Sequence, residues 1–209
     1  MIITKIEKQK NNNKRYSIFI DNEFAFGIDE VDLLYYKLKE NQPLDKQKYD
    51  YITNELLLKR AKDKALKYLG YKMRSKNQVV EKLKQDDFPD YVITKVINFL
   101  QKYNYINDDD FAKAFIKEKV NLKGYGVYKI SYDLKKLGVD PQIFEKYLYN
   151  TDFINEEEKV KTLLTKKLKG QSLQNLDYKE KQKIYAYLAR RGFSYDSINK
   201  GFNNLLEDF

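Results

Sequence analysis

The sequence predicts a mainly α-helical protein, in which three tandem three-helix repeats form an elongated, curved body behind a small N-terminal antiparallel β meander. Three observations lead to this prediction. The first 27 residues alternate β-branched or aromatic residues with polar ones, as strands do. From residue 29 onward, apolar residues recur at helical spacing. One pattern of leucine, loop and apolar residue occurs three times at nearly even spacing.

The composition is that of a folded protein with a polyanionic partner. The chain has 209 residues, of which 42% are hydrophobic, enough for a buried core. Lys and Arg number 40 against 31 Asp and Glu, a formal net charge of +9. Such a charge indicates nucleic acid, a nucleoprotein or an anionic membrane as partner. An AT-rich coding bias, which enriches Lys, Asn, Ile and Tyr, is the alternative explanation for the bulk charge.

Two residue types are missing, and their absence excludes several kinds of site. The chain has no cysteine and no histidine. Disulfides, thiolate nucleophiles, Cys/His zinc sites and a histidine base are therefore excluded within it. The N-terminal segment lacks the uncharged apolar stretch of a signal peptide, and no apolar run approaches the roughly 20 residues of a membrane span. We expect a cytoplasmic protein without membrane segment, cofactor or metal.

The β meander is expected to consist of three strands within residues 2–27. In residues 2–7, Ile2, Thr4 and Ile6 alternate with Ile3, Lys5 and Glu7. Residues 10–14 are rich in asparagine and lysine, as turns often are, and residues 15–21 are rich in β-branched and aromatic side chains. A sheet of this size is marginal alone, so it must pack against another part of the chain.

Helices are expected from Asp29 onward. The first begins with Asp29 as its N-cap. Its apolar face is expected to consist of Val31, Leu34, Tyr35 and Leu38. A long helical stretch follows from the N-cap Asp45 to about Leu69, broken near residue 57, with Gly70 at the C′ position.

The later helix starts carry recognisable cap residues. Ser75 and Gln78 have the spacing of a capping box, and Pro89 suits the first turn of the next helix. Acidic runs at 107–110 and 155–158 suit the positive ends of helix dipoles. These signals divide the chain into short helices joined by tight turns.

One spacing recurs in three helix pairs. Leu83, Leu134 and Leu188 are each followed five residues later by an apolar residue, and by another four or five positions further on. The aligned leucines are 51 and 54 residues apart. Gly138 and Gly192 both lie four residues after their leucine. An ordinary helical bundle is the alternative, but the matched loop glycines favour a repeat.

The predicted organisation is an N-terminal part with strands and helices, followed by three repeats. Its boundaries are 1–57 for the N-terminal part, 58–106 for the first repeat, 107–150 for the second and 151–209 for the third. The third repeat is expected to end in helices at about 177–191 and 195–207.

Charge follows the same periodicity. The net charge is +8 over residues 59–84, +5 over 113–136 and +6 over 159–183, whereas residues 85–110 carry −4 and residues 137–158 carry −5. If the repeats stack in register, the basic segments line up along one side. Such a surface suits an extended polyanion or a repeating filament.

The candidate binding residues are cations of the first two basic segments and of the turn before Gly192, most of them near helix ends and turns. They are Lys64, Lys67, Lys72, Arg74, Lys76, Lys123, Lys129, Lys135, Lys136, Arg190 and Arg191. For any one of them the alternative is a solvated side chain with no partner. Tyr71 and Tyr125, each close to a lysine at a turn, are the best candidates for stacking on single-stranded bases.

Four segments resemble the RecX family, the regulatory proteins of the RecA recombinase. They are ALKYLGYKMRSKNQVVEKL (65–83), YNYINDDDFAKAFIKEKV (103–120), GYGVYKISYDLKKLGVD (124–140) and YLARRGFSYDSI (187–198). The segment RYSIFIDNEFAFGID (15–29) is similar to the β extension of longer members. Departures from the family pattern are Val79 for Glu, Asn107 for Asp, Phe115 for Trp, Lys119 and Lys129 for Arg, and Leu137 for Lys. Lysine in place of arginine keeps the charge but loses bidentate geometry.

The resemblance implies a three-repeat helical protein that lies in the helical groove of the RecA–DNA filament, and we expect this protein to be a monomer. It would modulate filament growth and disassembly, and with them strand exchange, ATP hydrolysis and LexA-type cleavage, so that it acts in homologous recombination, DNA repair and the SOS response. It also implies binding to single- or double-stranded DNA without strong sequence preference. The alternative function is a sequence-independent DNA-binding protein with no RecA partner.

Two other functions are less well supported by the residues. The carboxylates at 108–110 and 156–158 are of the type that binds Mg²⁺, but acids at helix starts are more often caps, and no phosphate-binding glycine loop accompanies them. We therefore expect no catalytic residues and no enzyme. The helix pair at 177–207 resembles a helix-turn-helix, but Ile198 and Phe202 are expected in the core, whereas a recognition helix is polar.

Overall fold

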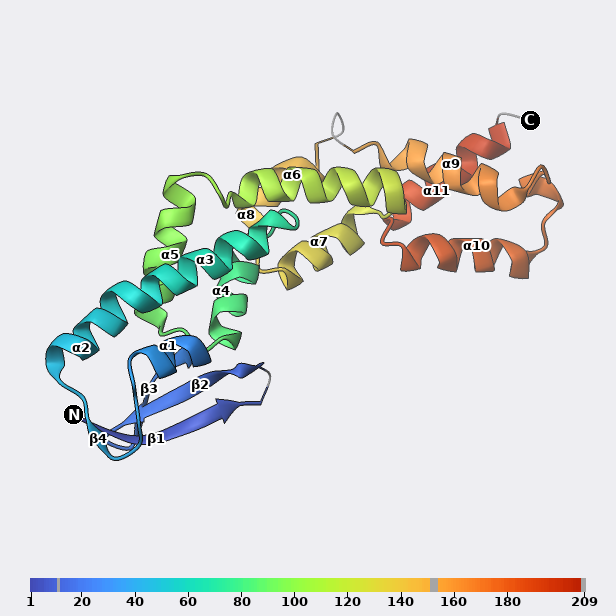
Figure 1. The fold of residues 1–209 in the computed structure, drawn as a ribbon. Helices are drawn as coiled ribbons and strands as arrows, with labels where there is room; N and C mark the ends of the chain where they lie inside the picture. The colour runs from blue at the N-terminus through green and yellow to red at the C-terminus, as the bar shows by residue number, and fades with distance from the viewer. Residues whose placement is uncertain (11, 151–153, 208–209) are drawn as a thin grey trace. The chain divides into compact units, whose positions relative to one another are not determined.

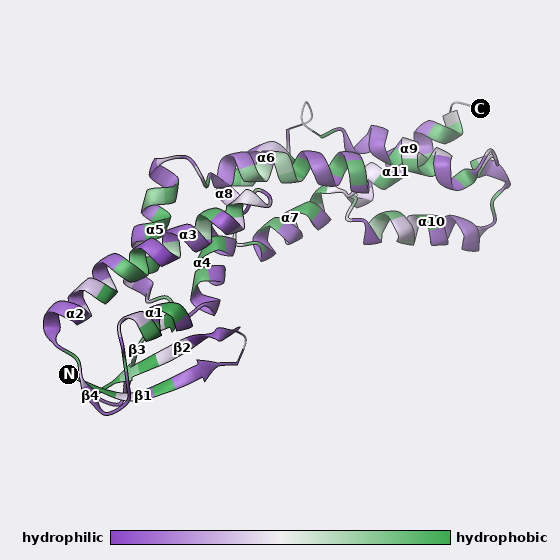
Figure 2. Cartoon of the chain, viewed as in Figure 1, coloured by the Kyte–Doolittle hydropathy of each residue, from purple (hydrophilic) through white to green (hydrophobic). Residues whose placement is uncertain are grey.

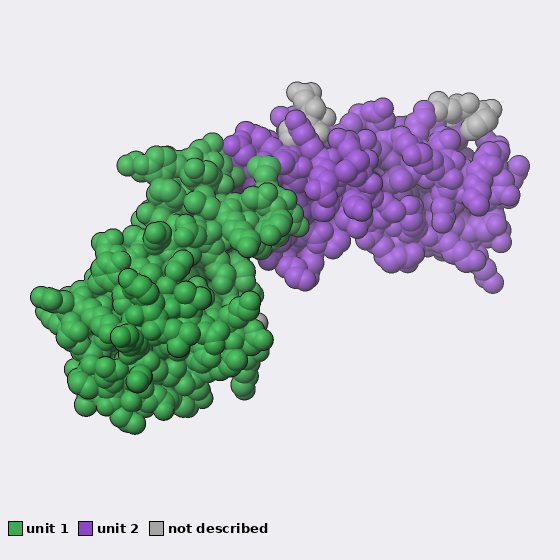
Figure 3. All heavy atoms as spheres, in the orientation of Figure 1, with its two compact units in different colours: residues 1–107 green, residues 108–209 purple. Residues whose placement is uncertain are grey.

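The computed structural model describes residues 1–10, 12–150 and 154–207. Asn11, in the expected turn at 10–14, lies outside the described residues, and so do residues 151–153, where the expected boundary between the second and third repeats falls. The chain divides into two compact units, residues 1–107 and 108–209 (Figure 3).

A four-stranded antiparallel sheet begins the first unit (Figure 1). Its strands are β1 (Ile2–Gln9), β2 (Asn12–Ile20), β3 (Glu23–Asp29) and β4 (Gln42–Pro43), in the order β3-β2-β1-β4. The prediction of three strands within residues 2–27 is wrong at both ends of the sheet. Strand β3 continues to Asp29, and the two-residue strand β4 pairs with Ile2 and Ile3, a contact that no local pattern signals.

The β2–β3 hairpin sets the register of the sheet. Asp21 and Asn22 both have positive φ angles, of 49° and 71°, as a two-residue hairpin turn requires. The hairpin places Ile18 opposite Phe26, and both side chains are fully buried. The inner face of the sheet belongs to one apolar core together with the helices of the first repeat.

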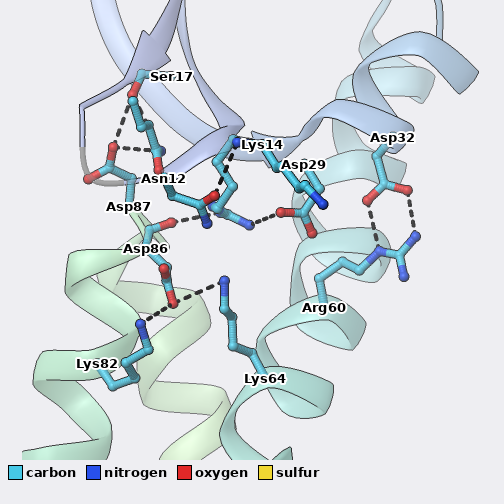
Figure 4. A network of polar contacts seen from close by, with 12 residues as sticks. Asn12, Lys14, Ser17, Asp29, Asp32, Arg60, Lys64, Lys82, Asp86 and Asp87 are labelled. Atoms are coloured by element: carbon cyan, nitrogen blue, oxygen red, sulfur yellow. Dashed lines mark hydrogen bonds and ion pairs between the residues drawn. The ribbon is translucent and has the colours of Figure 1, made fainter.

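Helix α1 (Glu30–Tyr35), which contains hydrophobic residues (Figure 2), is shorter than expected, and its apolar face is exposed to solvent. The exposed fractions are 72% for Val31, 69% for Leu34 and 75% for Tyr35, and only Leu38 is buried as expected. The buried residue of α1 is Asp32, whose carboxylate accepts two hydrogen bonds from Arg60 at 2.7 and 2.8 Å (Figure 4). This bidentate ion pair turns the polar side of the helix inward.

The long helical stretch after Asp45 is continuous. It consists of α2 (Lys46–Tyr51), the π-helical segment η1 (Ile52–Leu56) and α3 (Leu57–Gly70). The Asp45 side chain caps α2, as predicted, by accepting a hydrogen bond from the Lys48 N–H at 2.8 Å. The expected break near residue 57 is instead a change of helical winding. Gly70 is the last residue of α3 and not a C′ residue, because its backbone is not left-handed.

The remaining elements are helical, which confirms the predicted fold class of three three-helix repeats behind a small sheet. They are α4 (Lys76–Gln85), α5 (Asp90–Lys102), α6 (Asp108–Glu118), the π-helical η2 (Lys119–Lys123), α7 (Val127–Lys136), α8 (Pro141–Leu148), α9 (Glu156–Leu168), the 3₁₀ turn η3 (Leu173–Asn175), α10 (Tyr178–Arg190) and α11 (Tyr195–Glu207). The described residues from 108 onward contain no strand.

The turn after the second helix has the same geometry in each repeat. The N–H five positions after the repeat leucine donates to the leucine carbonyl, at 3.2 Å for Phe88, 3.1 Å for Val139 and 3.3 Å for Phe193. The residue just before that donor is left-handed, with φ of 54° at Asp87, 75° at Gly138 and 84° at Gly192. All three leucines are fully buried. The spacing seen in the sequence is therefore a helix end of the Schellman type, used three times.

In the first unit this turn holds the sheet against the first repeat. The buried Arg15 donates from Nη1 to the Asp29 carboxylate at 2.8 Å and from Nη2 to the Asp86 carbonyl at 2.6 Å. Its guanidinium also lies 4.5 Å from the centre of the Phe88 ring. Asp29 is the N-cap residue of α1, as predicted, but its side chain makes no capping hydrogen bond. Its carboxylate instead accepts a hydrogen bond from Arg15.

Asp87 makes the second set of contacts across the same junction (Figure 4). Its carbonyl accepts from the Gly27 N–H at 3.0 Å. Its carboxylate accepts from the Gln9 amide at 2.8 Å and from the Ser17 hydroxyl at 3.0 Å. The strands and the first repeat are thus joined by buried and half-buried hydrogen bonds as well as by a shared core.

In the second unit the corresponding turn joins the third repeat to the second. The Gly126 N–H donates to the Arg191 carbonyl at 2.9 Å, and the Tyr128 N–H donates to the Gly192 carbonyl at 3.0 Å. A Cβ on Gly126 would lie 2.4 Å from the Gly192 oxygen, and one on Gly192 would lie 2.3 Å from the Lys129 nitrogen. The two backbones approach so closely that neither glycine has room for a side chain.

Replacement of Arg15 by Leu should destabilise the first unit. It leaves the Asp86 carbonyl without its donor in a buried place, which costs about 2 kcal/mol in the free energy of unfolding. Urea unfolding followed by circular dichroism measures the change. Lys14→Leu, which removes the same charge from the neighbouring exposed residue, is the control. Equal stability of the two variants would show that the Arg15 contacts do not hold the junction.

Two alanine substitutions separate backbone strain from steric clash in the second unit. Gly170 and Gly192 both have left-handed φ angles, but a Cβ on Gly170 meets no atom within 4 Å. Gly170→Ala should therefore cost only about 1 kcal/mol of left-handed strain, whereas Gly192→Ala should cost about 3 kcal/mol because it also forces the repeats apart. Similar unfolding free energies for both variants would contradict the close approach at Gly192.

Candidate nucleic-acid interface

The basic cluster of the first unit lies where α3 ends and α4 begins. Lys67, Lys72 and Lys76 are exposed there. The predicted capping box is present: the Gln78 N–H donates to the Ser75 hydroxyl at 3.2 Å, and the Ser75 N–H donates to the Gln78 side-chain oxygen at 3.1 Å. Because Ser75 is fully buried, the cap fixes the turn to the core while its lysines face solvent.

Two other predicted binding residues of this cluster are engaged within the fold. The half-buried Arg74 places its guanidinium 4.1 Å from the centre of the Tyr68 ring. The Lys64 ammonium lies 3.2 Å from an Asp86 carboxylate oxygen, which Lys82 approaches to 3.3 Å (Figure 4). Both residues support the fold: Arg74 stiffens the α3–α4 turn, and Lys64 ties α3 to the turn that carries the sheet.

The predicted binding residues of the second unit also divide into side chains that are exposed to solvent and side chains that contact other residues of the fold. Lys123, Lys135, Lys136 and Arg190 are exposed, and Lys129 and Arg191 are half-buried. Arg191 donates from Nη1 to the carbonyls of Lys123 and Gly124, and its guanidinium lies 4.8 Å from the centre of the Tyr187 ring. It acts as a clamp between the third repeat and the α6–α7 loop.

Lys129 is occupied on its own helix. Its ammonium lies 2.7 Å from the Asp133 carboxylate, and this hydrogen bond raises the pKa of Lys129. Its backbone lies against Gly192, so it belongs to the joint between the repeats. The structure thus brings Lys123, Lys129 and the Arg190–Arg191 turn to one end of α7. Lys135 and Lys136 are at the other end, roughly 10 Å along the helix axis.

Of the two tyrosines proposed for base stacking, one is in a suitable place. Tyr71 is 74% exposed at the α3–α4 turn. Tyr125 is half-buried and packs against the core of the second repeat. Met73, 53% exposed beside Tyr71, was not a candidate from the sequence. The sequence contains a signal for Met73, since a large apolar residue between Lys72 and Arg74 is unusual in a charged turn.

The first acidic run does not form a metal site in the structure. The Asp109 carboxylate lies 2.7 Å from both Lys113 and Lys146 and accepts a hydrogen bond from the Tyr147 hydroxyl. The hydrogen bond with Lys113, followed by those with Lys146 and Tyr147, holds the pKa of Asp109 well below its usual range. Among the residues described, no group of three or more acidic side chains is arranged to hold a metal ion.

Glu156, in the second acidic run, has a role that the sequence did not suggest. Its carboxylate accepts from the Val127 N–H at 2.7 Å and from the Ser197 hydroxyl at 2.8 Å. Val127 is the first residue of α7, Ser197 lies in the first turn of α11, and Glu156 itself begins α9. One carboxylate therefore serves three helix N-termini, each with the partial positive charge that favours an anion.

The helix-turn-helix alternative is not supported by the packing of the last helix. Ile198 is buried and Phe202 packs against the core of the third repeat, as predicted. Helix α11 therefore uses its apolar face within the fold. In the part of the chain that the structure describes, no helix combines the length and the apolar character needed to cross a membrane.

Protein-family models match four segments of the chain. "Regulatory protein RecX N-terminal domain" matches residues 1–45, and the first, second and third three-helix domains of RecX match residues 61–100, 107–148 and 155–201. The matched segments contain the sheet and helices of all three repeats.

Curated relatives and solved structures agree with these matches. A "Regulatory protein RecX" of Clostridium botulinum (strain Alaska E43 / Type E3) is 34% identical over 198 residues, which is 94% of this chain and 92% of the relative. A "Regulatory protein RecX" of Caldanaerobacter subterraneus subsp. tengcongensis is 32% identical, over 97% of this chain and 99% of the relative. A crystal structure of regulatory protein RecX superposes with a TM-score of 0.64 at 27% identity, covering 97% of this chain and 98% of its own. RecX from Lactobacillus salivarius also gives 0.64, at 29% identity, over 72% of this chain and 97% of its own.

Neighbouring arginines should respond differently to the loss of charge. Arg191→Gln removes the clamp on the α6–α7 loop and should lower the unfolding free energy by about 2 kcal/mol. Arg190→Gln changes an exposed side chain and should stay within about 0.5 kcal/mol of the unsubstituted protein. Urea unfolding of both variants checks this. An equally stable Arg191→Gln protein would show that the clamp contributes nothing.

Proposed function

Because the chain belongs to the RecX family of regulatory proteins, we propose that it regulates a RecA recombinase by binding the RecA filament on DNA. In this proposal it lies in the filament groove and alters filament growth and disassembly. Strand exchange, ATP hydrolysis and coprotease activity of RecA change as a consequence, and with them recombination, DNA repair and the SOS response. We assign this activity to the cytoplasm because the DNA partner is there.

The observation that carries the proposal is the set of cations that the fold leaves exposed. Of the eleven predicted binding residues, Lys64, Arg74, Lys129 and Arg191 are half-buried and contact other parts of the fold, and the other seven are exposed to solvent. The seven are Lys67, Lys72, Lys76, Lys123, Lys135, Lys136 and Arg190. Both compact units carry some of them, so that both have a surface suited to phosphates. Two such surfaces on one chain raise the effective concentration of each for a continuous polyanion.

Helix α1 favours a protein partner in addition to DNA. Its exposed apolar residues border a pocket of about 450 Å³ whose lining includes Val31, Tyr35 and Tyr51. The charged residues in that lining, two acidic and two basic, balance each other. A neutral apolar surface offers no attraction to the DNA phosphates, whereas the centre of a protein–protein interface is usually apolar. This surface supports binding to RecA protein over the alternative of a DNA-binding protein with no RecA partner.

Co-sedimentation tests the choice between these two functions. Filaments of the cognate RecA on single-stranded DNA, RecA alone and the DNA alone are each incubated with the protein and pelleted. Stronger retention by the filament than by either component supports the proposal. Retention by DNA and filament in equal measure would favour the DNA-only alternative, and no retention by the filament would reject the proposed function.

Replacing Lys67, Lys72 and Lys76 together by Ala should weaken binding to single-stranded DNA and reduce its salt dependence. Each lost phosphate contact changes the slope of log K against log salt by about 0.7, so that three contacts flatten it by roughly 2. The control variant replaces Lys8, Lys39 and Lys46, exposed lysines outside the basic segments, and has the same net charge. Identical slopes in the two variants would mean that the cluster does not contact phosphates.

A further inference from the structure

The α3–α4 turn presents two large apolar side chains to solvent. Tyr71 is 74% exposed and Met73 is 53% exposed, with Lys72 between them. The C-cap of α3 is Tyr71, and the N-cap of α4 is Ser75, so the two apolar residues lie in the five-residue turn 71–75, which we call the tip. Exposure of two such side chains so close together carries a cost in water that a partner would remove.

The tip is held in place from both sides. On the α3 side, Arg74 stacks on the ring of Tyr68 at 4.1 Å. On the α4 side, Ser75 is buried within its capping box. Ala65 and Val79, the buried residues nearest to the turn on each helix, anchor it to the core. The conformational entropy of the turn is therefore already lost before any partner binds, which favours a binding role for the tip.

Charge around the tip identifies the partner. The sequence contains no acidic residue between Asp63 and Glu81, and this interval holds five of the predicted cations. An apolar tip within cationic surroundings fits a partner that offers apolar faces beside negative charges. Single-stranded DNA does so at every nucleotide, since each unpaired base has a π-face next to a phosphate. A duplex keeps its bases stacked inside.

Tyr35 shows that exposure alone does not indicate a nucleic acid. It is exposed to the same extent as Tyr71, at 75%, and lies in the same unit. Its surroundings, the α1 pocket, carry balanced charges. Tyr71 differs in having only cations as charged neighbours in the sequence, and Tyr35 is thus a matched control for it.

We propose that Tyr71, assisted by Met73, stacks on an unpaired base of single-stranded DNA while Lys67, Lys72 and Lys76 contact the phosphates beside it. This rests on the DNA-binding part of the proposed function and assigns the base-contacting residue within it. A surface of this kind binds without regard to sequence, because every base offers a face for stacking. It also prefers single strands over duplexes, in which the bases are not available.

An oligonucleotide with abasic sites tests the stacking directly, because it keeps the phosphates and lacks the bases. Tyr71→Ala should weaken binding to an ordinary single strand about tenfold. On the abasic strand the variant and the unsubstituted protein should bind equally. The salt slope should stay unchanged, since the lysines are still present. Tyr35→Ala should bind both strands as the unsubstituted protein does.

A tryptophan probe gives a second test that does not depend on losing a side chain. The chain has no tryptophan, so Tyr71→Trp introduces a single indole whose fluorescence is quenched when a base stacks on it. The same substitution at Tyr35 should show no quenching with single-stranded DNA. Circular dichroism confirms that each variant is folded.

The outcomes separate the two proposals. Tenfold weaker binding that disappears on the abasic strand, together with quenching at position 71 alone, supports stacking. Normal DNA binding without any effect of Tyr71→Ala overturns stacking and leaves the DNA-binding function in place. An unsubstituted protein that does not bind single-stranded DNA overturns both. A blue shift of the indole emission with anionic phospholipid vesicles, without quenching by DNA, would show that the tip contacts a membrane surface and would also overturn the proposal.

Discussion

The structure depends on one recurring device, the pair of carbonyl groups at the turn after the second helix of a repeat. A helix leaves its last carbonyls without partners inside the helix, and a left-handed residue turns the chain so that they face outward. In the first unit these are the carbonyls of Asp86 and Asp87, which accept from Arg15 and Gly27. In the second unit they are those of Arg191 and Gly192, which accept from Gly126 and Tyr128. A β-sheet and a helical repeat are therefore attached by the same pair of acceptors.

The difference between the two junctions explains which residue occupies the left-handed position. At Gly192 the neighbouring backbone of Lys129 leaves no room for a Cβ, so glycine is required. At Asp87 the approaching strand supplies the glycine instead, and a Cβ on Gly27 would lie 2.9 Å from that of Asp87. The Asp87 side chain then adds contacts across the junction, because Gln9 and Ser17 donate hydrogen bonds to its carboxylate. Its left-handed strain, about 1 kcal/mol, is offset by these two hydrogen bonds.

Local signals predicted most of the fold, and contacts between residues far apart in the sequence account for most of what they missed. The buried repeat leucines, the Ser75 capping box and the Asp45 cap depend on residues within five positions of each other, and all are present. Helix α1 has a clear apolar stripe, but Asp32 pairs with Arg60, 28 positions away, and turns the stripe outward. Strand β4 also cannot be predicted from its own sequence, because it is defined by its pairing with the start of β1. In the candidate site, the sequence identified basic clusters but not which of their members the fold uses.

At two turns an arginine that contacts the fold lies close in the sequence to a cation that is exposed to solvent. Lys72 is exposed next to the anchored Arg74, and Arg190 is exposed next to the clamp Arg191. Lys72 and Arg190 are thus carried by a backbone that a nearby arginine holds in place, and a rigid backbone reduces the entropy lost when a phosphate binds. The net charge of the chain therefore overestimates the number of cations available for binding, since some of them stabilise the turns. For the same reason a charge-reversing substitution in these clusters tests binding only when it falls on an exposed member. On an anchored one, it changes the stability of the turn that presents the others.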